Sequence, residues 1–127
     1  MANAVDFGFG YEGSFGLSQA VRAGNLVILS GQMPMNPDLT LVGEGDVRAQ
    51  TRKVFENMQQ VLKSAGVGFE DVAELVSYHT DMADLTVVAE VKAEFFPRDF
   101  PAWTAIGVTA LAFPGQLIEI KATAVVR

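Results

Sequence analysis

The chain has 127 residues, 50% of them hydrophobic and 19% charged, a size and composition that predict one folded domain over residues 1–127 and exclude a disordered chain. Its formal net charge of -6 disfavours nucleic acids and anionic membranes as partners, because both carry negative charge. There is no cysteine, which excludes disulfides, thiolate nucleophiles and cysteine-based zinc sites.

The first third of the chain is predicted to contain three short strands. Residues 1–16 mix glycines with aromatic residues, a composition that favours irregular backbone. From residue 19 a short strand, a turn at residues 23–25 and a strand over residues 26–31 predict a hairpin. A third short strand is expected around residues 39–42, between turn-forming residues.

The middle of the chain predicts two helices separated by a strand. Apolar residues recur at helical spacing over residues 46–65, where Asp46 suits the N-cap and Gly66 the C-terminal stop. The run "VAELVSYHTD" is rich in Val and Tyr and predicts a strand, although its first residues could also form one helical turn. A second helix is expected over residues 85–96, capped by Asp81 or Asp84 and ended by Pro97.

The last third alternates in polarity and predicts two strands on either side of a turn at residues 114–115. The resulting β-β-β-α-β-α-β-β order is typical of an α+β fold in which two helices pack on one mixed sheet. The opposite sheet face then needs a cover, and a second copy of the chain is the simplest one. A chain this small and apolar is therefore expected to form a homo-oligomer.

The expected location is the cytoplasm. The N-terminus "MANAVDFGFG" lacks the basic and apolar regions of a signal peptide. No apolar run approaches the ~20 residues that a membrane helix needs. A membrane is therefore not an expected partner.

Three polar residues are candidates for chemistry. His79 would titrate in a useful range and Asp81 could orient it, although a surface or interface histidine is the plainer interpretation. Glu119 interrupts an apolar strand, and cover by another subunit would raise its pKa and suit it to proton transfer. The alternative for Glu119 is a solvated strand residue paired with Lys121 or with a residue of a neighbouring strand. Ser30 has no base nearby in sequence and is interpreted as a hydrogen-bond donor.

Trp103, in "FPAWTAIGV", is the single tryptophan. Its position at the start of a predicted strand is typical of a large apolar residue that fills a core or an interface.

Several motifs indicate a family resemblance that covers nearly the whole chain. They are "NLVILSGQMPMNP" from residue 25, "QTRKVFEN" from residue 50, "FF" at residues 95–96, "FPA" at residues 100–102 and "IEIKATA" from residue 118. With these the chain resembles the Rid family, also called the YjgF or RidA family. The resemblance implies a chorismate-mutase-like fold assembled as a homotrimer, with a barrel-like core and clefts between subunits. It implies hydrolysis of reactive enamines and imines such as 2-aminoacrylate, with no metal or cofactor.

The resemblance also implies site residues. Glu119 matches the glutamate that activates water, and Ser30 with the backbone at Gly31 is expected to hold the substrate. Trp103 stands where the family has an arginine that clamps a substrate carboxylate. Leu17 and Ala105 stand where a tyrosine and a cysteine are usual. Arg98, Arg22 or Lys121 are the candidates to replace the missing charge.

The leading hypothesis is an enzyme that deaminates an enamine, an imine, or a related conjugated or aromatic-derived small molecule by hydrolysis. Because the arginine is absent, activity on 2-aminoacrylate is expected to be weak. The alternative is a non-catalytic trimer that binds a metabolite or a partner protein. A nuclease is disfavoured by the net charge of -6.

Overall fold

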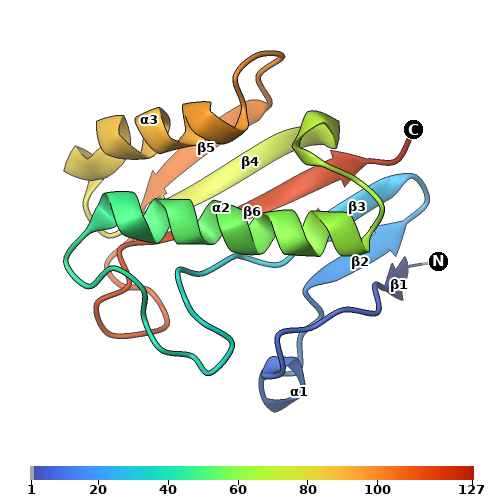
Figure 1. Cartoon of the computed structure of the whole chain (residues 1–127), viewed down its shortest axis with the longest axis horizontal. Helices are drawn as coiled ribbons and strands as arrows, with labels where there is room; N and C mark the ends of the chain where they lie inside the picture. The colour runs from blue at the N-terminus through green and yellow to red at the C-terminus, as the bar shows by residue number, and fades with distance from the viewer. Residues whose placement is uncertain (1) are drawn as a thin grey trace.

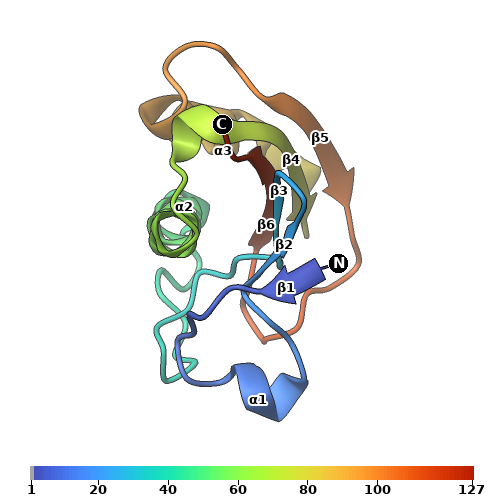
Figure 2. The ribbon, with the colours of Figure 1, turned by 90° about the vertical axis from the view of Figure 1, so that its right-hand side faces the viewer.

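The computed structural model describes residues 2–127 and consists of one mixed β-sheet with two long helices on one of its faces (Figures 1 and 2). The strands are β1 (Ala2–Ala4), β2 (Ala20–Ala23), β3 (Leu26–Leu29), β4 (Val72–His79), β5 (Ala102–Gly107) and β6 (Ile118–Val125). The helices are α1 (Glu12–Phe15), α2 (Val47–Ser64) and α3 (Leu85–Phe95), with 3-10 turns at Phe69–Asp71 and Met82–Asp84. The α+β class, the two packed helices and the mixed sheet confirm the predicted architecture.

The strands are arranged in the order β1-β2-β3-β6-β4-β5. Only the pair β4 and β5 is parallel, whereas the other neighbours are antiparallel. β6, the last strand in the sequence, is thus central and lies between β3 and β4. This central position explains why every second residue of β6 is apolar, because one face of the strand is buried in the core along its length.

The predicted hairpin and the first long helix are confirmed. β2 and β3 pair antiparallel, and Gly24 between them has a φ of 62°, a conformation that glycine adopts without strain. Helix α2 begins after Asp46, whose carboxylate accepts a hydrogen bond of 3.1 Å from the backbone N–H of Ala49. It ends before Gly66, which has a φ of 76°.

Two details of the prediction are wrong. Residues 39–42 do not form a strand, because only Met35 and Leu41 make an isolated bridge there. The first strand is β1 instead, and it pairs with β2 at the sheet edge. The predicted cap of α3 is confirmed in position, because Asp84 is its N-cap residue, although its side chain makes no capping bond. Asp81 instead caps the preceding 3-10 turn, where its carboxylate accepts from the backbone N–H of Ala83.

The two faces of the sheet differ in what covers them. The face under α2 and α3 carries the core, which includes buried residues of β6 at positions 118, 120, 122 and 124. On the opposite face no helix lies over the sheet in Figure 2. Ile28 remains 43% exposed and Leu26 38% exposed within the chain. Cover of this face by another copy of the chain remains a prediction.

Candidate functional site

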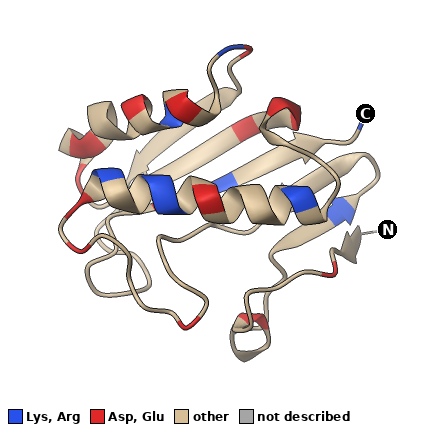
Figure 3. Ribbon diagram, in the orientation of Figure 1, with Lys and Arg blue, Asp and Glu red and all other residues tan. Residues whose placement is uncertain are grey.

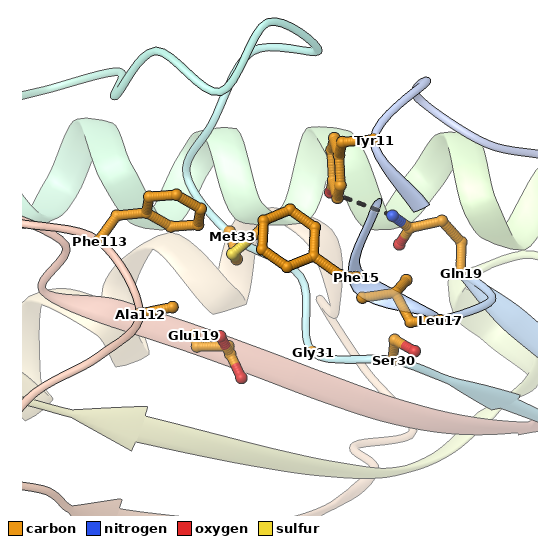
Figure 4. Close-up of a pocket in the computed structure, with 10 residues that line it drawn as sticks. All are labelled: Tyr11, Phe15, Leu17, Gln19, Ser30, Gly31, Met33, Ala112, Phe113 and Glu119. Atoms are coloured by element: carbon orange, nitrogen blue, oxygen red, sulfur yellow. Dashed lines mark hydrogen bonds between the residues drawn. The ribbon is translucent and has the colours of Figure 1, made fainter. Parts of the chain in front are cut away.

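A pocket of about 320 Å³ lies beside the first residues of β6, where three separate segments meet (Figure 4). Some of the side chains that line the pocket come from the segment around α1 and others from the segment that follows β3. The loop between β5 and β6 supplies further lining residues. The lining residues are Tyr11, Phe15, Leu17, Gln19, Ser30, Gly31, Met33, Ala112, Phe113 and Glu119. Four predicted site residues, namely Leu17, Ser30, Gly31 and Glu119, are therefore brought together.

Glu119 is the second residue of β6, and its carboxyl group lies against the backbone of Gly31. A Cβ atom at position 31 would lie only 2.7 Å from Cδ of Glu119, so only glycine leaves room for this arrangement. The side-chain amide of Gln116 approaches Oε1 of Glu119 at 3.5 Å. Burial raises the pKa of the Glu119 carboxyl, and the contact with Gln116 lowers it in part.

Glu119 takes part in no ion pair within residues 2–127, so the predicted alternative of a pair with Lys121 does not occur in this structure. Lys121 is exposed on the same side of β6, two residues further along, and it does not line the pocket. The carboxyl of Glu119 is therefore a partly buried acid beside an apolar cavity, without a compensating cation in the described part of the chain.

Ser30 serves as a hydrogen-bond donor, as predicted. Its Oγ donates to the carbonyl oxygen of Ser18 at 2.6 Å, which ties the end of β3 to the segment before β2. The backbone N–H of Ser30 donates to the carbonyl of Gln19 at 2.9 Å. Ser30 thus holds two walls of the pocket together.

Tyr11 is a pocket residue that the sequence analysis missed. The amide nitrogen of the buried Gln19 donates to the Tyr11 hydroxyl oxygen at 3.0 Å and to Oε2 of Glu12 at 2.7 Å. The Gln19 oxygen in turn accepts from the side chain of Gln32 at 2.9 Å. Because the Tyr11 oxygen is the acceptor in its bond with Gln19, its own O–H remains available to donate into the pocket. The phenol thus comes from position 11, whereas the resemblance implied one at position 17.

Burial raises the pKa of Tyr11. The bond from Gln19 lowers it in part, and the charges of Glu12 and Glu119 raise it further. Tyr11 is therefore a hydrogen-bond donor at neutral pH. The glycine and aromatic pattern of residues 1–16 was the only signal in the sequence that pointed to this segment.

Two buried amides of α2 hold the loops that carry the pocket. Gln50 Oε1 accepts from the backbone N–H of Leu117 at 2.8 Å, and its Nε2 donates to the carbonyls of Gly43 and Gly115, both at 3.0 Å. Asn57 donates to the carbonyl of Met33 at 2.9 Å, close to the pocket wall. The motif "QTRKVFEN" therefore has a structural role in keeping these loops in place.

Trp103 lies on the helix-covered side of the sheet and does not line the pocket. Its indole N–H donates to Ser77 Oγ at 2.8 Å, and the ammonium of Lys92 lies 5.0 Å from its ring centroid. Within one chain Trp103 packs at the edge of the core. Its place in a cleft between subunits stays a prediction.

The remaining candidates also lie outside this pocket. Ala105 is on β5, two residues beyond Trp103. Arg98 follows α3 and lines a different depression with Phe69 and Arg127. Arg22 lies beside Ala4 in another depression, so none of the expected replacement cations reaches the pocket lining.

His79 is buried, so its interpretation as a surface residue is wrong. It is 1% exposed, and its Nε2 lies 2.7 Å from Ser77 Oγ. Asp81 does not orient the ring, because its carboxylate accepts from Ala83 instead. Burial lowers the pKa of His79, and the charge of Asp84 raises it in part. Since Ser77 accepts from Trp103, its hydroxyl proton is available to His79, which favours the neutral imidazole.

No group of three His, Cys, Asp or Glu side chains within residues 2–127 has a geometry that could hold a metal ion. Also within this range, no helix is long and apolar enough to cross a membrane.

Residues 12–126 match the family model described as Endoribonuclease L-PSP. The chain belongs to this family, the Rid or YjgF family. Among curated Rid relatives, a RutC family protein of Pyrococcus horikoshii is 40% identical over 107 residues, covering 84% of each chain. The 3-aminoacrylate deaminase RutC of Acinetobacter baylyi is 37% identical, covering 83% of this chain and 82% of its own.

The fold agrees with that of a solved Rid structure. The chain is similar to a Mycobacterium tuberculosis member of the YjgF/YER057c/UK114 family, with a TM-score of 0.85 and 35% identity over 99% of this chain and 100% of that one. The predicted family and chorismate-mutase-like fold are therefore confirmed.

Proposed function

We propose that this Rid protein hydrolyses an enamine or imine to a carbonyl compound and ammonia, with Glu119 as the residue that positions and activates water. The observation that carries the proposal is the partly buried Glu119 carboxyl against Gly31 in the wall of an apolar pocket. The similarity to a protein named 3-aminoacrylate deaminase supports the same class of reaction.

The reaction needs one group that can both accept and return a proton. Water adds to the carbon of the C=N bond while the Glu119 carboxylate takes one of its protons. The resulting carbinolamine then releases ammonia when the proton is returned to nitrogen, and the carbonyl forms. Burial raises the pKa of Glu119 above its ordinary value, which makes the carboxylate a better proton acceptor for the first step. The free O–H of Tyr11 is positioned to donate to a polar atom of the substrate.

We also propose that the active unit is a homotrimer in the cytoplasm, with a single domain per chain. In this assembly the edge strand β5 would bring Trp103, Ala105 and the nearby Arg98 to the cleft of a neighbouring subunit. The exposed apolar residues on the uncovered sheet face, such as Ile28, support the association. A molecular mass of three chains in light scattering is the expected result.

Activity on 2-aminoacrylate is proposed to be weak. This substrate carries a carboxylate, and a guanidinium at position 103 would bind it through charge-assisted hydrogen bonds worth about 1.5–3 kcal/mol. Trp103 cannot form them. Other conjugated or aromatic-derived imines are therefore the better candidates.

The test is turnover by the purified protein of freshly generated 2-aminoacrylate and of uncharged imines. Wild type should accelerate hydrolysis of at least one of them, and Glu119→Gln should abolish the acceleration without changing the circular dichroism spectrum. Turnover that never exceeds buffer, together with a ligand recovered unaltered, would instead support a non-catalytic binding protein.

An endoribonuclease activity is not proposed, although the family model carries that description. The chain has a net charge of -6, and two of its arginines, Arg48 and Arg52, are paired with Glu90 and Glu94, which disfavours binding of an RNA backbone.

A further inference from the structure

The segments that build the pocket contain acidic residues and no basic ones. In the sequence, Lys and Arg are absent from residues 1–21, 23–47 and 99–120, which include every residue of the pocket lining. The same segments carry Asp and Glu at positions 6, 12, 38, 44, 46, 99 and 119. In Figure 3 the end of the molecule around α1 accordingly shows red segments and no blue.

Three cations of the helical layer, Arg48, Arg52 and Lys92, make contacts away from the pocket. Arg48 and Arg52 pair with Glu90 and Glu94 across the outer surface of α2 and α3, at 2.6 and 2.7 Å. Lys92 lies over the ring of Trp103 on the other side of the sheet from Glu119. No Lys or Arg of residues 2–127 is among the residues that line the pocket.

One further anion lies close behind the pocket. Glu12 contacts Gln19, a lining residue, through the bond at 2.7 Å. Burial raises the pKa of Glu12, but the bonds from Gln19 and from the backbone N–H groups of Phe9 and Gly10 lower it by more, so the net direction is downward. Glu12 is therefore ionised at neutral pH and adds to the negative potential around Tyr11.

Three aromatic rings that contact one another in a row form part of the apolar wall of the pocket. Tyr11 and Phe15 are in edge contact with centroids 6.1 Å apart, and Phe15 contacts Phe113 in the same way at 6.4 Å. Figure 4 shows Phe15 and Phe113 on the same side of the cavity, above Glu119. Aromatic faces attract cations, and a carboxylate beside them adds a full negative charge. A pocket of about 320 Å³ has room for a ring-sized substituent.

From this charge distribution we infer that the substrate is an imine without a carboxylate, bound as the protonated iminium, with an aromatic or similarly flat apolar substituent. The inference rests on the proposed function and specifies its substrate class. In the reaction, one iminium ion and one water molecule give one carbonyl compound and one ammonium ion. The C=N bond is lost, a C=O bond forms to the water oxygen, and nitrogen leaves with both protons of the water.

The physical reason is the sign of the charges. The iminium nitrogen is positively charged and pairs with the Glu119 carboxylate. The same ion pair places the electrophilic iminium carbon next to the water that Glu119 activates. A substrate carboxylate in the pocket would be repelled by the Glu119 carboxylate, and no Lys or Arg among residues 2–127 lines the pocket to oppose this repulsion.

The first experiment compares two imines that differ only in the carboxylate. Phenethylamine with an amine oxidase yields 2-phenylethanimine, and phenylalanine with an amino-acid oxidase yields 2-imino-3-phenylpropanoate, both in the presence of catalase. Loss of the imine is followed by semicarbazide trapping. The expected acceleration by the protein is at least tenfold larger for 2-phenylethanimine. Equal or larger acceleration of the imino acid would overturn the inference.

The second experiment separates ligand class from catalysis. Phenethylammonium and 3-phenylpropanoate are titrated by calorimetry into wild type and Glu119→Gln. We expect wild type to bind the cation at least tenfold more tightly than the anion, and Glu119→Gln to lose most of that preference. If the cation binds but neither imine is hydrolysed, the ligand class holds and the deaminase proposal fails. If the anion binds more tightly, the inference fails whatever the activity.

A matched pair of lysine variants tests whether Lys121, which lies on the same face of β6 as Glu119, binds a substrate carboxylate. Lys121→Gln and Lys63→Gln remove the same charge, the second from the exposed end of α2. Neither should change the preference for 2-phenylethanimine. Selective loss of imino-acid turnover in Lys121→Gln would show that Lys121 binds a carboxylate, against the inference.

Discussion

The carboxyl group of Glu119 occupies the space that a side chain at Gly31 would fill, with its Cδ 2.7 Å from the ideal Cβ position. β6 presents the acid, and the chain leaving β3 presents the bare backbone against which it lies. Since this relationship fixes where the carboxylate points, the geometry of the proposed reaction depends on a residue that has no side chain of its own.

Gly31→Ala is therefore expected to displace Glu119 and lower deaminase kcat/KM by about tenfold or more, in line with the ~1.4 kcal/mol that a tenfold change represents. The φ of Gly31 is not in the left-handed region, so the variant should fold. Gly13→Ala is the matched control, because a Cβ there meets nothing within 4 Å. Unchanged kinetics in Gly31→Ala would contradict the role of this contact.

Glu119 should also set the pH dependence. Its pKa is raised in the folded protein by burial, so activity that needs the carboxylate should fall as the pH drops through this raised pKa. Because the pKa of Glu119 is higher in the folded state than in the unfolded state, its contribution to the free energy of unfolding depends on pH. That contribution is fully present below the unfolded-state pKa and is lost as the pH rises through the folded-state pKa.

Glu119→Gln should accordingly be more stable than wild type at neutral pH, by about 0.5–2 kcal/mol, and lose this advantage in acid. Urea unfolding at several pH values measures the effect. Glu56→Gln removes an exposed carboxylate of α2 and should show no such gain. A Glu119→Gln protein that is less stable than wild type at neutral pH would refute the assignment.

Gln50→Met should destabilise the fold by about 2–4 kcal/mol, because it leaves the N–H of Leu117 and the carbonyls of Gly43 and Gly115 without their partner. The loop carrying Phe113 should loosen with it, which would raise KM more than it lowers kcat. Gln59→Met, at an exposed position of the same helix, should change stability little. Equal unfolding midpoints for the two variants would contradict this prediction.

Trp103→Arg tests whether position 103 reaches the cleft of another subunit. If it does, the arginine should raise kcat/KM for carboxylated imines about tenfold or more through charge-assisted bonds. Lys92 lies over the Trp103 ring, so an arginine there meets a like charge, and Trp103→Arg should be made together with Lys92→Met. An unchanged substrate preference in a folded double variant would place Trp103 outside the site.

The sequence alone determined the elements whose signal is local. The periodicity of α2, its Asp46 cap, the turn at Gly24 and the alternation of β6 each depend on neighbours within one element, so they could be predicted residue by residue. The motifs around Ser30 and Glu119 pointed to two walls of the pocket. They could not reveal that Gly31 makes the room that Glu119 occupies.

Only the tertiary structure decided which residues share the site. β6 enters the centre of the sheet between β3 and β4, which places Glu119 beside Gly31 and leaves Trp103 on the opposite, helix-covered side. Tyr11 reaches the pocket through Gln19 from a segment without a regular pattern. Such contacts depend on strand order and side-chain packing between distant segments, and no local periodicity encodes them.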